Sequence, residues 1–551
     1  MRVLRSVVLT SAVAASLGIA PWILAEPAES AANRHKQVDA LFEPPGGPAA
    51  PGCAVGISAD GALEYARGYG MANLESGVPM APDSVLHVAS IAKQFTAFSI
   101  GLLAQEGKLS VDDDIRKYVP ELPDYGKKIT LAHLLHHTSG LREQGQLLNL
   151  AGWRGDDLYT EEDILQALTR QHRLNFDPGT EIVYTNTAYT LLGVVVKRVS
   201  GKPLKVFAQE RIFAPLAMTD TRFRDDHAEL VPRRAPAYIA RRGGGWDIAV
   251  PNIDHYGSTS LLTTVGDLLK WERNLVDAKV GGPALIQWME ASGTLNDGTA
   301  TQYGAGLRVE NYRGVRLVSH DGADGGYRAE ASLFPEQRLA IVALCNNGGA
   351  GPTELVRKVA EIYLGDRLRG PKFPSAVAMP ASEQAAKAGA YWSPLTDEVV
   401  QLEWKDGALR QVGSATAMVP VGKDSFRPGE SDHEWRFDGS ALYIRDFWPV
   451  PRRFTRITTA LPGPEALASL AGEYRSEETK MTYTVRVADG RLRLSWPRAY
   501  DLALDPVGGD RFVGSRGTVT FERQASGEIT GLTISNRRLR RLSASRLASE
   551  G

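Results

Sequence analysis

Apolar and polar residues follow two different patterns along the chain. Between about residues 34 and 368, short apolar runs typical of strands are interspersed with longer stretches of helical periodicity. Residues 53–70, CAVGISADGALEYARGYG, predict a strand pair joined by an Asp-Gly turn. Residues 86–107, LHVASIAKQFTAFSIGLLAQEG, predict a helix with one apolar face.

Later segments complete this first region. Residues 129–141 predict a helix with Gly140 as its C-cap. Further helices are predicted within residues 182–193, 263–276 and 353–365, and strands at residues 314–322, 327–335 and 339–347. Strands at both ends of a region with helices between them indicate one sheet completed by the two ends. This is an α/β or α+β layered fold.

Beyond residue 368 the pattern changes to short alternating strands separated by Gly and Asp turns. A linker rich in Pro, Ala and Ser covers residues 369–386. An internal repeat follows, because AGAYWS recurs as AGEYRS and EWKDGALR recurs as RVADGRLR. We expect two small antiparallel β-barrels, at residues 387–458 and 468–548.

The first 25 residues have the features of a secretory signal peptide. MRVLR is basic, an apolar run follows it, and small residues precede a polar stretch, so cleavage is predicted after Ala25. An uncleaved membrane anchor is the alternative. We therefore expect an exported protein, periplasmic or secreted, that is not inserted in the membrane after cleavage.

Composition and cysteine content narrow the possible partners. The 551 residues suffice for two or three domains, and the formal net charge of -1 gives no reason to expect nucleic acid. Without an H-E-x-x-H motif, a Cys/His cluster or a phosphate-binding glycine loop, neither a metal nor another cofactor is expected. We interpret Cys53 and Cys345 as two separate buried thiols, with a bond between them as the alternative.

The strongest candidate chemistry lies in the helix predicted at residues 86–107. Ser90 and Lys93 are three residues apart, so they share a helix face and can hydrogen-bond. A serine hydroxyl needs a base beside it, and a lysine amine is such a base once burial or neighbours lower its pKa. The first helical turn adds N–H groups that favour developing negative charge. Alone, however, S-x-x-K is also explained by chance.

Two further elements supply matching chemistry. Tyr184 and Asn186 lie where a loop enters a helix, so a phenol can relay protons and an amide can hold the lysine and a substrate carbonyl. His320 and Gly322 lie at the end of an apolar strand, where glycine admits substrate and the N–H of Ala323 can point at a reacting carbonyl. Singly, a packed tyrosine or a turn histidine explains each element equally well.

In this order, S-x-x-K, Y-x-N and H-x-G resemble the motifs of the serine β-lactamase and penicillin-binding-protein superfamily, in particular its class C-like branch. The resemblance extends over residues 34–368 and implies a β-lactamase/transpeptidase-like domain with a mostly antiparallel sheet and a helical lobe. It implies that Ser90 is acylated, with Lys93 as its base partner and Tyr184 as proton shuttle. By the same resemblance, the N–H groups of Ser90 and Ala323 form the oxyanion hole.

One motif departs from most of the superfamily. The third motif of its β-lactamases and D,D-peptidases is K-T-G, whereas this chain has His320-Asp321-Gly322, and an Asp facing the site would repel a substrate carboxylate. This favours small amides, esters or short peptides with a free amino end. With two C-terminal lipocalin-like barrels, the chain resembles the D-aminopeptidases of the superfamily. A carboxylesterase, then a β-lactamase or D,D-peptidase, and last a non-catalytic sensor remain as alternatives.

Overall fold

A computed structural model describes residues 28–548 except residues 250, 447, 459–461 and 499. The signal peptide predicted at residues 1–25 lies outside the described residues. Among the helices that are described, none combines the length and the apolar character needed to cross a bilayer.

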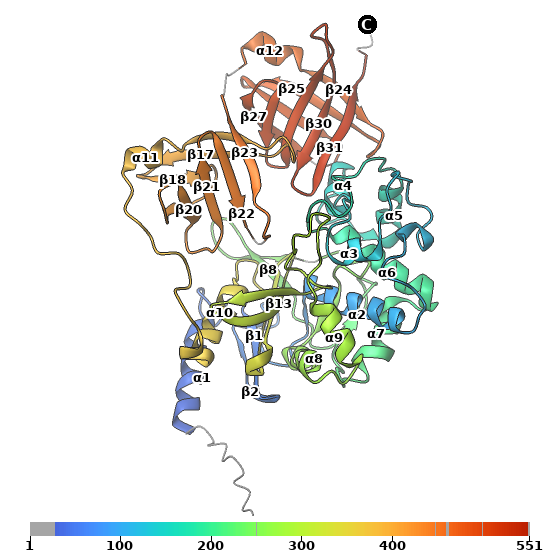
Figure 1. Ribbon diagram of the computed structural model, residues 1–551, viewed down its shortest axis with the longest axis vertical. Coiled ribbons are helices and arrows are strands. Elements are labelled where there is room, and N and C mark those ends of the chain that lie inside the picture. Colours follow the sequence, from blue (N-terminus) through green and yellow to red (C-terminus); the bar gives the residue numbers. More distant parts are fainter. Residues whose placement is uncertain (1–27, 250, 447, 459–461, 499, 549–551) are drawn as a thin grey trace, which may run out of the picture.

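A six-stranded antiparallel sheet forms the centre of the first unit, residues 28–368 (Figure 1). Its order is β12-β13-β14-β15-β1-β2, so strands from the two ends of the unit pair directly, as the sequence predicts. The strands are β1 (Cys53–Ala59), β2 (Ala62–Tyr69), β12 (Arg308–Tyr312), β13 (Val315–Asp324), β14 (Tyr327–Phe334) and β15 (Leu339–Cys345). The β1–β2 turn has positive φ at Asp60 and Gly61, which explains the Asp-Gly pair there.

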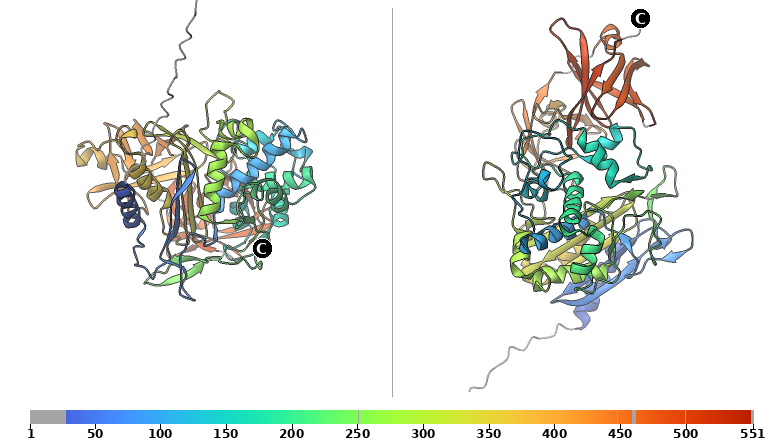
Figure 2. Two further views of the ribbon diagram at one scale, coloured as in Figure 1. Left: turned by 90° about the horizontal axis from the view of Figure 1, so that it is seen from below. Right: turned by 90° about the vertical axis from the view of Figure 1, so that its right-hand side faces the viewer.

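Helices cover both faces of this sheet. On one face α1 (Ala28–Phe42) and α10 (Pro352–Leu364) enclose one apolar cluster, and α8 (Val265–Asp277) packs on the other face (Figure 2, left). Beside α8 lies a helical lobe. Its helices are α2 (Ala92–Gln105), α3 (Leu131–Leu135), α4 (Gln144–Leu150), α5 (Glu161–Thr169), α6 (Asn186–Ser200), α7 (Leu204–Ala208) and α9 (Gly282–Glu290).

Small sheets join the lobe to the central sheet. They consist of β3 (Met71–Asn73) with β4 (Val78–Pro79), β5 (Leu86–His87) with β11 (Leu261–Thr263) and β7 (Arg222–Phe223), β6 (Tyr159–Thr160) with β10 (Ile253–Asp254), and β8 (Ala237–Ala240) with β9 (Trp246–Ala249).

Two predicted helix boundaries are wrong. The segment from residue 86 starts as strand β5, and α2 begins only at Ala92 after a short 3₁₀ turn. Helix α3 ends at Leu135, so Gly140 is not its C-cap. Gly140 has φ +76°, and a Cβ there would lie 2.1 Å from the carbonyl oxygen of Phe176. The glycine is therefore required by a close backbone approach and not by a helix end.

The prediction of two separate thiols is also wrong. Cys53 and Cys345 lie opposite each other in the β1–β15 ladder and form a disulfide. The two cysteines are 292 positions apart in the sequence, and they meet because the first strand of the sheet pairs with the last. Their spacing alone does not reveal this pairing.

Replacing both Cys53 and Cys345 by Ala is expected to lower the free energy of unfolding by about 2–5 kcal/mol, because the bond constrains a long loop in the unfolded chain. Urea unfolding of the wild-type and double-variant proteins measures the change. A reductant should shift the unfolding transition of the wild-type protein to lower urea concentration and leave that of the double variant unchanged. If the two proteins unfolded at the same urea concentration without reductant, the prediction would be wrong.

Two eight-stranded antiparallel units follow, one nearly closed and one a closed barrel, as predicted. The first comprises β16 (Gly389–Trp392), β17 (Val399–Lys405), β18 (Ala408–Gln411), β19 (Met418–Pro420), β20 (Ser425–Pro428), β21 (Glu434–Asp438), β22 (Ala441–Arg445) and β23 (Arg452–Ile457), preceded by α11 (Ala381–Ala385). The second comprises β24 (Gly472–Ser476), β25 (Met481–Ala488), β26 (Arg491–Trp496), β27 (Tyr500–Gly508), β28 (Arg511–Gly514), β29 (Gly517–Arg523), β30 (Ile529–Asn536) and β31 (Leu539–Arg546), preceded by α12 (Pro464–Ser469).

The second barrel packs directly on the helical lobe, above α4 in Figure 1. The Tyr483 hydroxyl donates to the carbonyl of Leu150 at 2.9 Å, and Trp496 Nε1 donates to the carbonyl of Asn149 at 3.2 Å. A buried ion pair joins Arg142 of the first unit to Glu478 of the barrel. These contacts fix α4 and the loop before it, which lie beside the candidate site.

Candidate active site

Ser90 occupies the 3₁₀ turn Ala89–Ile91 at the entrance to α2. The residue before it, Ala89, has φ +47°, a left-handed conformation that costs an alanine free energy and that is common at functional sites. Strand β13 crosses directly over this turn: a Cβ at Gly322 would lie 2.2 Å from the carbonyl oxygen of Val88. Glycine at position 322 therefore allows the strand to reach the serine.

Lys93 links Ser90 to two other chain segments. Its Nζ donates to Ser90 Oγ at 2.9 Å, to Asn186 Oδ1 at 2.8 Å and to the carbonyl of Ser258 at 2.7 Å. The side chain is fully buried. Burial lowers the pKa of Lys93 to about 7, partly opposed by the negative charge of Glu143. A substantial fraction of the amine is therefore neutral near pH 7 and able to accept a proton.

Glu143 orients this group, and the sequence analysis missed it. Its carboxylate accepts from the backbone N–H of Asn186 at 2.6 Å and from Asn186 Nδ2 at 3.0 Å. Because Nδ2 is held by Glu143, Oδ1 of Asn186 must face Lys93. Glu143 is buried and lies immediately before α4. No sequence pattern indicated it, because it is a loop residue brought into place by tertiary packing.

Replacing Glu143 by Gln is expected to lower kcat about tenfold to a hundredfold, the usual scale for misplaced catalytic groups. The loss of its negative charge also lowers the pKa of Lys93 further, so the rising limb of the rate–pH profile should move to lower pH. A merely structural role would leave that limb in place. An unchanged profile would contradict the positioning role.

The ring of Tyr184 lies close to the Lys93 amine. The lysine Nζ lies 4.9 Å from the centre of the Tyr184 ring, and the ring packs on His137 with 4.2 Å between centroids. The phenol oxygen of Tyr184 is buried and makes no hydrogen bond of normal geometry to the described residues. The nearby Ser90 side chain lowers the pKa of Tyr184. Burial nevertheless raises the pKa of Tyr184 well above its usual value. Tyr184 is therefore a neutral phenol that can donate a proton.

His320 also lies near Tyr184, with 6.2 Å between ring centroids. Its Nδ1 donates to the carbonyl of Asp321 at 2.6 Å, so its Nε2, 2.9 Å from the Tyr303 hydroxyl, accepts from that group. Burial lowers the pKa of His320 and keeps it neutral. Tyr303 was another residue that the sequence analysis missed.

Asp321, the acidic residue of the third motif, was expected to repel a substrate carboxylate, but a nearby cation compensates its charge. Asp321 forms a 2.7 Å ion pair with Arg308, which compensates its charge. Arg308 comes from β12, whose pairing with β13 begins at Ser319. Residues 320–324 therefore extend beyond β12 and, in the described part of the chain, have a strand partner only on the β14 side. Ala323, an exposed residue, lies on this segment.

Loops from both barrels complete the site. Arg538, in the β30–β31 loop, places its guanidinium 5.2 Å from the centre of the Tyr184 ring, and its carbonyl accepts from the N–H of Glu143 at 3.1 Å. Trp448, in the β22–β23 loop, packs on Tyr303 with 6.0 Å between ring centroids. The sequence analysis identified neither loop, because each contact joins residues more than a hundred positions apart.

One group of three possible metal ligands exists among the described residues: Asp226, His227 and Asp254. Asp254 already accepts two hydrogen bonds from His227, at 2.6 and 3.0 Å, which accounts for the proximity of these two side chains without an ion. The groups around Ser90 are instead suited to nucleophilic and acid–base chemistry.

Comparison with known proteins gives one family match and several relatives. The β-lactamase family model matches residues 38–364. A D-aminopeptidase from Brucella anthropi is 27% identical over 515 residues, covering 88% of this chain and 93% of the relative. The structure of an octameric penicillin-binding protein homologue from Pyrococcus abyssi shares the fold with a TM-score of 0.55 at 24% identity, covering 78% of this chain and 98% of that one. A D-amino acid amidase from Ochrobactrum anthropi SV3 aligns with a TM-score of 0.51 at 23% identity, covering 61% of this chain and 99% of that one.

Proposed function

Because this chain belongs to the β-lactamase family and is a serine hydrolase of that fold, we propose that it releases D-amino acids from small amides or short peptides through an acyl-Ser90 intermediate. The observation that carries this proposal is the buried Lys93, hydrogen-bonded at once to Ser90 and Asn186. The D-aminopeptidase relative, which aligns over most of both chains, supports the substrate class.

The geometry supports the following acylation step. Neutral Lys93 takes the proton of Ser90 as Oγ attacks the substrate carbonyl, and the N–H groups of Ser90 and Ala323 bind the oxyanion. The leaving nitrogen takes a proton from the Tyr184 hydroxyl, which Lys93 then reprotonates. The C–N bond breaks and leaves the acyl group on Ser90. Water repeats the sequence to release the acid.

The proposed role of neutral Lys93 has a definite pH dependence. The value of kcat/KM is expected to rise through a pKa near 7, because Lys93 accepts a proton only in its deprotonated form. Tyr184, with its raised pKa, keeps its proton until far more alkaline pH. Initial rates from pH 5 to 10 measure the profile, and a rate that falls between pH 6 and 8 would contradict this assignment.

We also propose that the protein is exported. The predicted signal at residues 1–25 is one support, and the Cys53–Cys345 disulfide is a second, because such bonds persist mainly in oxidising compartments.

Initial rates on the p-nitroanilides of D-alanine and L-alanine test the substrate class, with the Ser90→Ala protein as control. Faster, Ser90-dependent release from the D isomer is expected. Hydrolysis of p-nitrophenyl acyl esters with no release from either anilide would replace the proposal by a carboxylesterase.

A further inference from the structure

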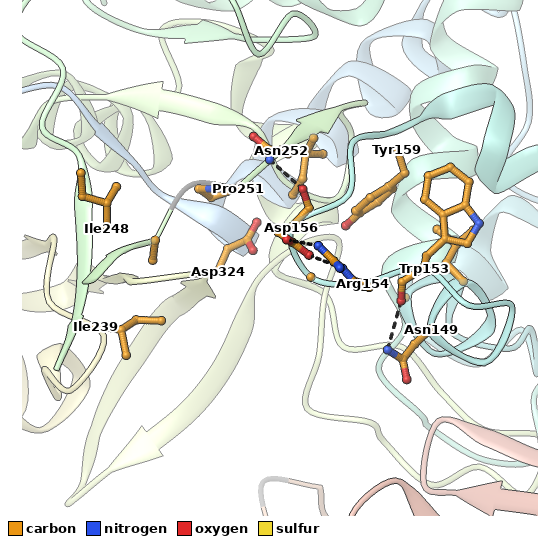
Figure 3. A pocket seen from close by; sticks show the side chains of 16 residues that line it. Asn149, Trp153, Arg154, Asp156, Tyr159, Ile239, Ile248, Pro251, Asn252 and Asp324 are labelled. Carbon is orange, nitrogen blue, oxygen red and sulfur yellow. Dashed lines mark hydrogen bonds and ion pairs between the residues drawn. The ribbon is translucent and has the colours of Figure 1, made fainter. Parts of the chain in front are cut away.

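A cavity of about 490 Å³ has Asp324, the last residue of β13, in its wall (Figure 3). Its walls come from α4 and the loop after it, from the β8–β9 hairpin, and from the end of β13. Neither the sequence analysis nor the proposed mechanism uses this cavity. Its position and its charge together indicate what it binds.

Two chain segments connect the cavity wall to the residues around Ser90. Asp324 lines it at the end of β13, directly after Ala323. The Thr259 hydroxyl donates to the Asp324 carboxylate at 3.1 Å, and the neighbouring carbonyl of Ser258 accepts from Lys93. The negative charge of Asp324 also acts on the Lys93 amine. A substrate whose carbonyl lies on Ser90 can therefore extend toward Asp324.

The Asp324 carboxylate has no cationic partner among the described residues. Its one ion-pair neighbour is His87, whose Nε2 lies 3.9 Å away. That nitrogen accepts from the N–H of Ser260 at 3.2 Å, and burial lowers the pKa of His87 to about 4. His87 is therefore neutral near pH 7 and does not compensate Asp324. Figure 3 shows the carboxylate directed into the cavity.

The other charged side chains of the cavity wall compensate each other. Arg154 forms an ion pair with Asp156, and both side chains line the cavity. Since this pair is neutral as a whole, Asp324 leaves the cavity with one uncompensated negative charge. A carboxylate in an otherwise neutral wall favours a cationic ligand.

Much of the remaining wall is apolar. Ile239 and Ile248, from the β8–β9 hairpin, are 47% and 46% exposed, which is high for isoleucine. Opposite them lie Trp153, from the loop after α4, and Tyr159, from β6 (Figure 3). An apolar group between these walls would be removed from water while a cation beside it reached Asp324.

We infer that this cavity is the acyl-side subsite, in which Asp324 binds the free ammonium group of an aminoacyl substrate whose apolar side chain packs between the β8–β9 hairpin and Trp153. The inference rests on the proposed function and adds a specificity-determining residue to it. A substrate with a blocked amine places a neutral group against an uncompensated carboxylate and loses this interaction.

Binding of D-phenylalaninamide to the Ser90→Ala protein, measured by calorimetry, tests the subsite without requiring turnover. Adding Asp324→Asn is expected to weaken binding about tenfold to a hundredfold, the range for a lost charge-assisted contact. N-acetyl-D-phenylalaninamide should bind the Ser90→Ala protein with a similar loss, and Asp324→Glu should retain most of the affinity. The control Asp226→Asn removes one charge from an exposed residue outside the cavity wall and should change affinity less than twofold.

Equal binding of the free and acetylated amides, unchanged affinity with Asp324→Asn, or no binding at millimolar ligand would each overturn the inference. Ile248→Ser should weaken binding of D-phenylalaninamide more than that of D-alaninamide, and equal effects would overturn the role of the apolar wall. If the amide binds through Asp324 but wild-type protein never cleaves it, the subsite stands and the proposed amide hydrolysis fails.

Discussion

Replacing Ser90 by Ala is expected to reduce kcat by at least about ten-thousandfold, because the substitution removes the nucleophile that forms the acyl intermediate. The fold should persist, since Ser90 lies on a turn at the entrance to α2 and its hydroxyl accepts a hydrogen bond from Lys93 that contributes little to folding. Initial rates on D-alanine p-nitroanilide measure the loss. Thermal unfolding of the variant shows whether the loss of activity comes from misfolding.

Ser110→Ala is a suitable control for this variant, because Ser110 is an exposed loop serine. Its rates should equal those of the wild type. Retention of more than a few per cent of the activity by the Ser90→Ala protein would exclude an obligatory acyl-Ser90 and with it the mechanism.

Replacing Tyr184 by Phe is expected to lower kcat about a hundredfold or more, the usual contribution of a positioned acid–base group. The ring and its contact with His137 are retained, so the loss reports the hydroxyl alone. Because that hydroxyl makes no hydrogen bond of normal geometry to described residues, removing it should cost little stability. Stopped-flow rates with substrates of different leaving groups measure the effect.

The matched control is Tyr189→Phe. Tyr189 also lies near Lys93, at 5.7 Å from its ring centre, but its hydroxyl donates to the carbonyl of Leu135 at 2.7 Å. Loss of that bond should reduce stability by about 1 kcal/mol while leaving kcat nearly unchanged. If both variants lost activity equally, or if Tyr184→Phe lost none, the proton-shuttle role of Tyr184 would be wrong.

Sequence patterns predicted those parts of the fold that are determined locally. The β1–β2 hairpin follows from its Asp-Gly turn, and α8 follows from an apolar stripe with Thr264 accepting from the N–H of Asp267 as its cap. The start of α2 was predicted too early because Leu86 and His87 are recruited into a sheet by β11. Such long-range strand pairing leaves no trace in a helical period.

The residues of the candidate site also fall into those that local sequence predicts and those that it does not. Ser90 and Lys93 could be recognised because their three-residue spacing determines their proximity on one helical turn. Glu143, Tyr303 and Arg538 could not, since each comes from a loop whose position depends on tertiary packing. The disulfide partner of Cys53 belongs to the same class, because only the strand order brings Cys345 opposite it.

The folded protein shows how the site accommodates His320-Asp321-Gly322 in place of K-T-G. At the lysine position the chain has a neutral histidine held by Tyr303, and the adjacent Asp321 is compensated by Arg308. This part of the site therefore presents little net charge to a substrate. The uncompensated charge lies instead at Asp324, on the opposite side of Ala323, where an ammonium group would be favoured.

The most direct test of the account is mass spectrometry of the protein quenched with acid during turnover of a D-phenylalanine ester. The account predicts a mass increase equal to one D-phenylalanyl group, located by peptide mapping on Ser90 and absent from the Ser90→Ala protein. An adduct on another residue, or steady turnover with no adduct while Ser90→Ala remains active, would contradict the acyl-Ser90 mechanism.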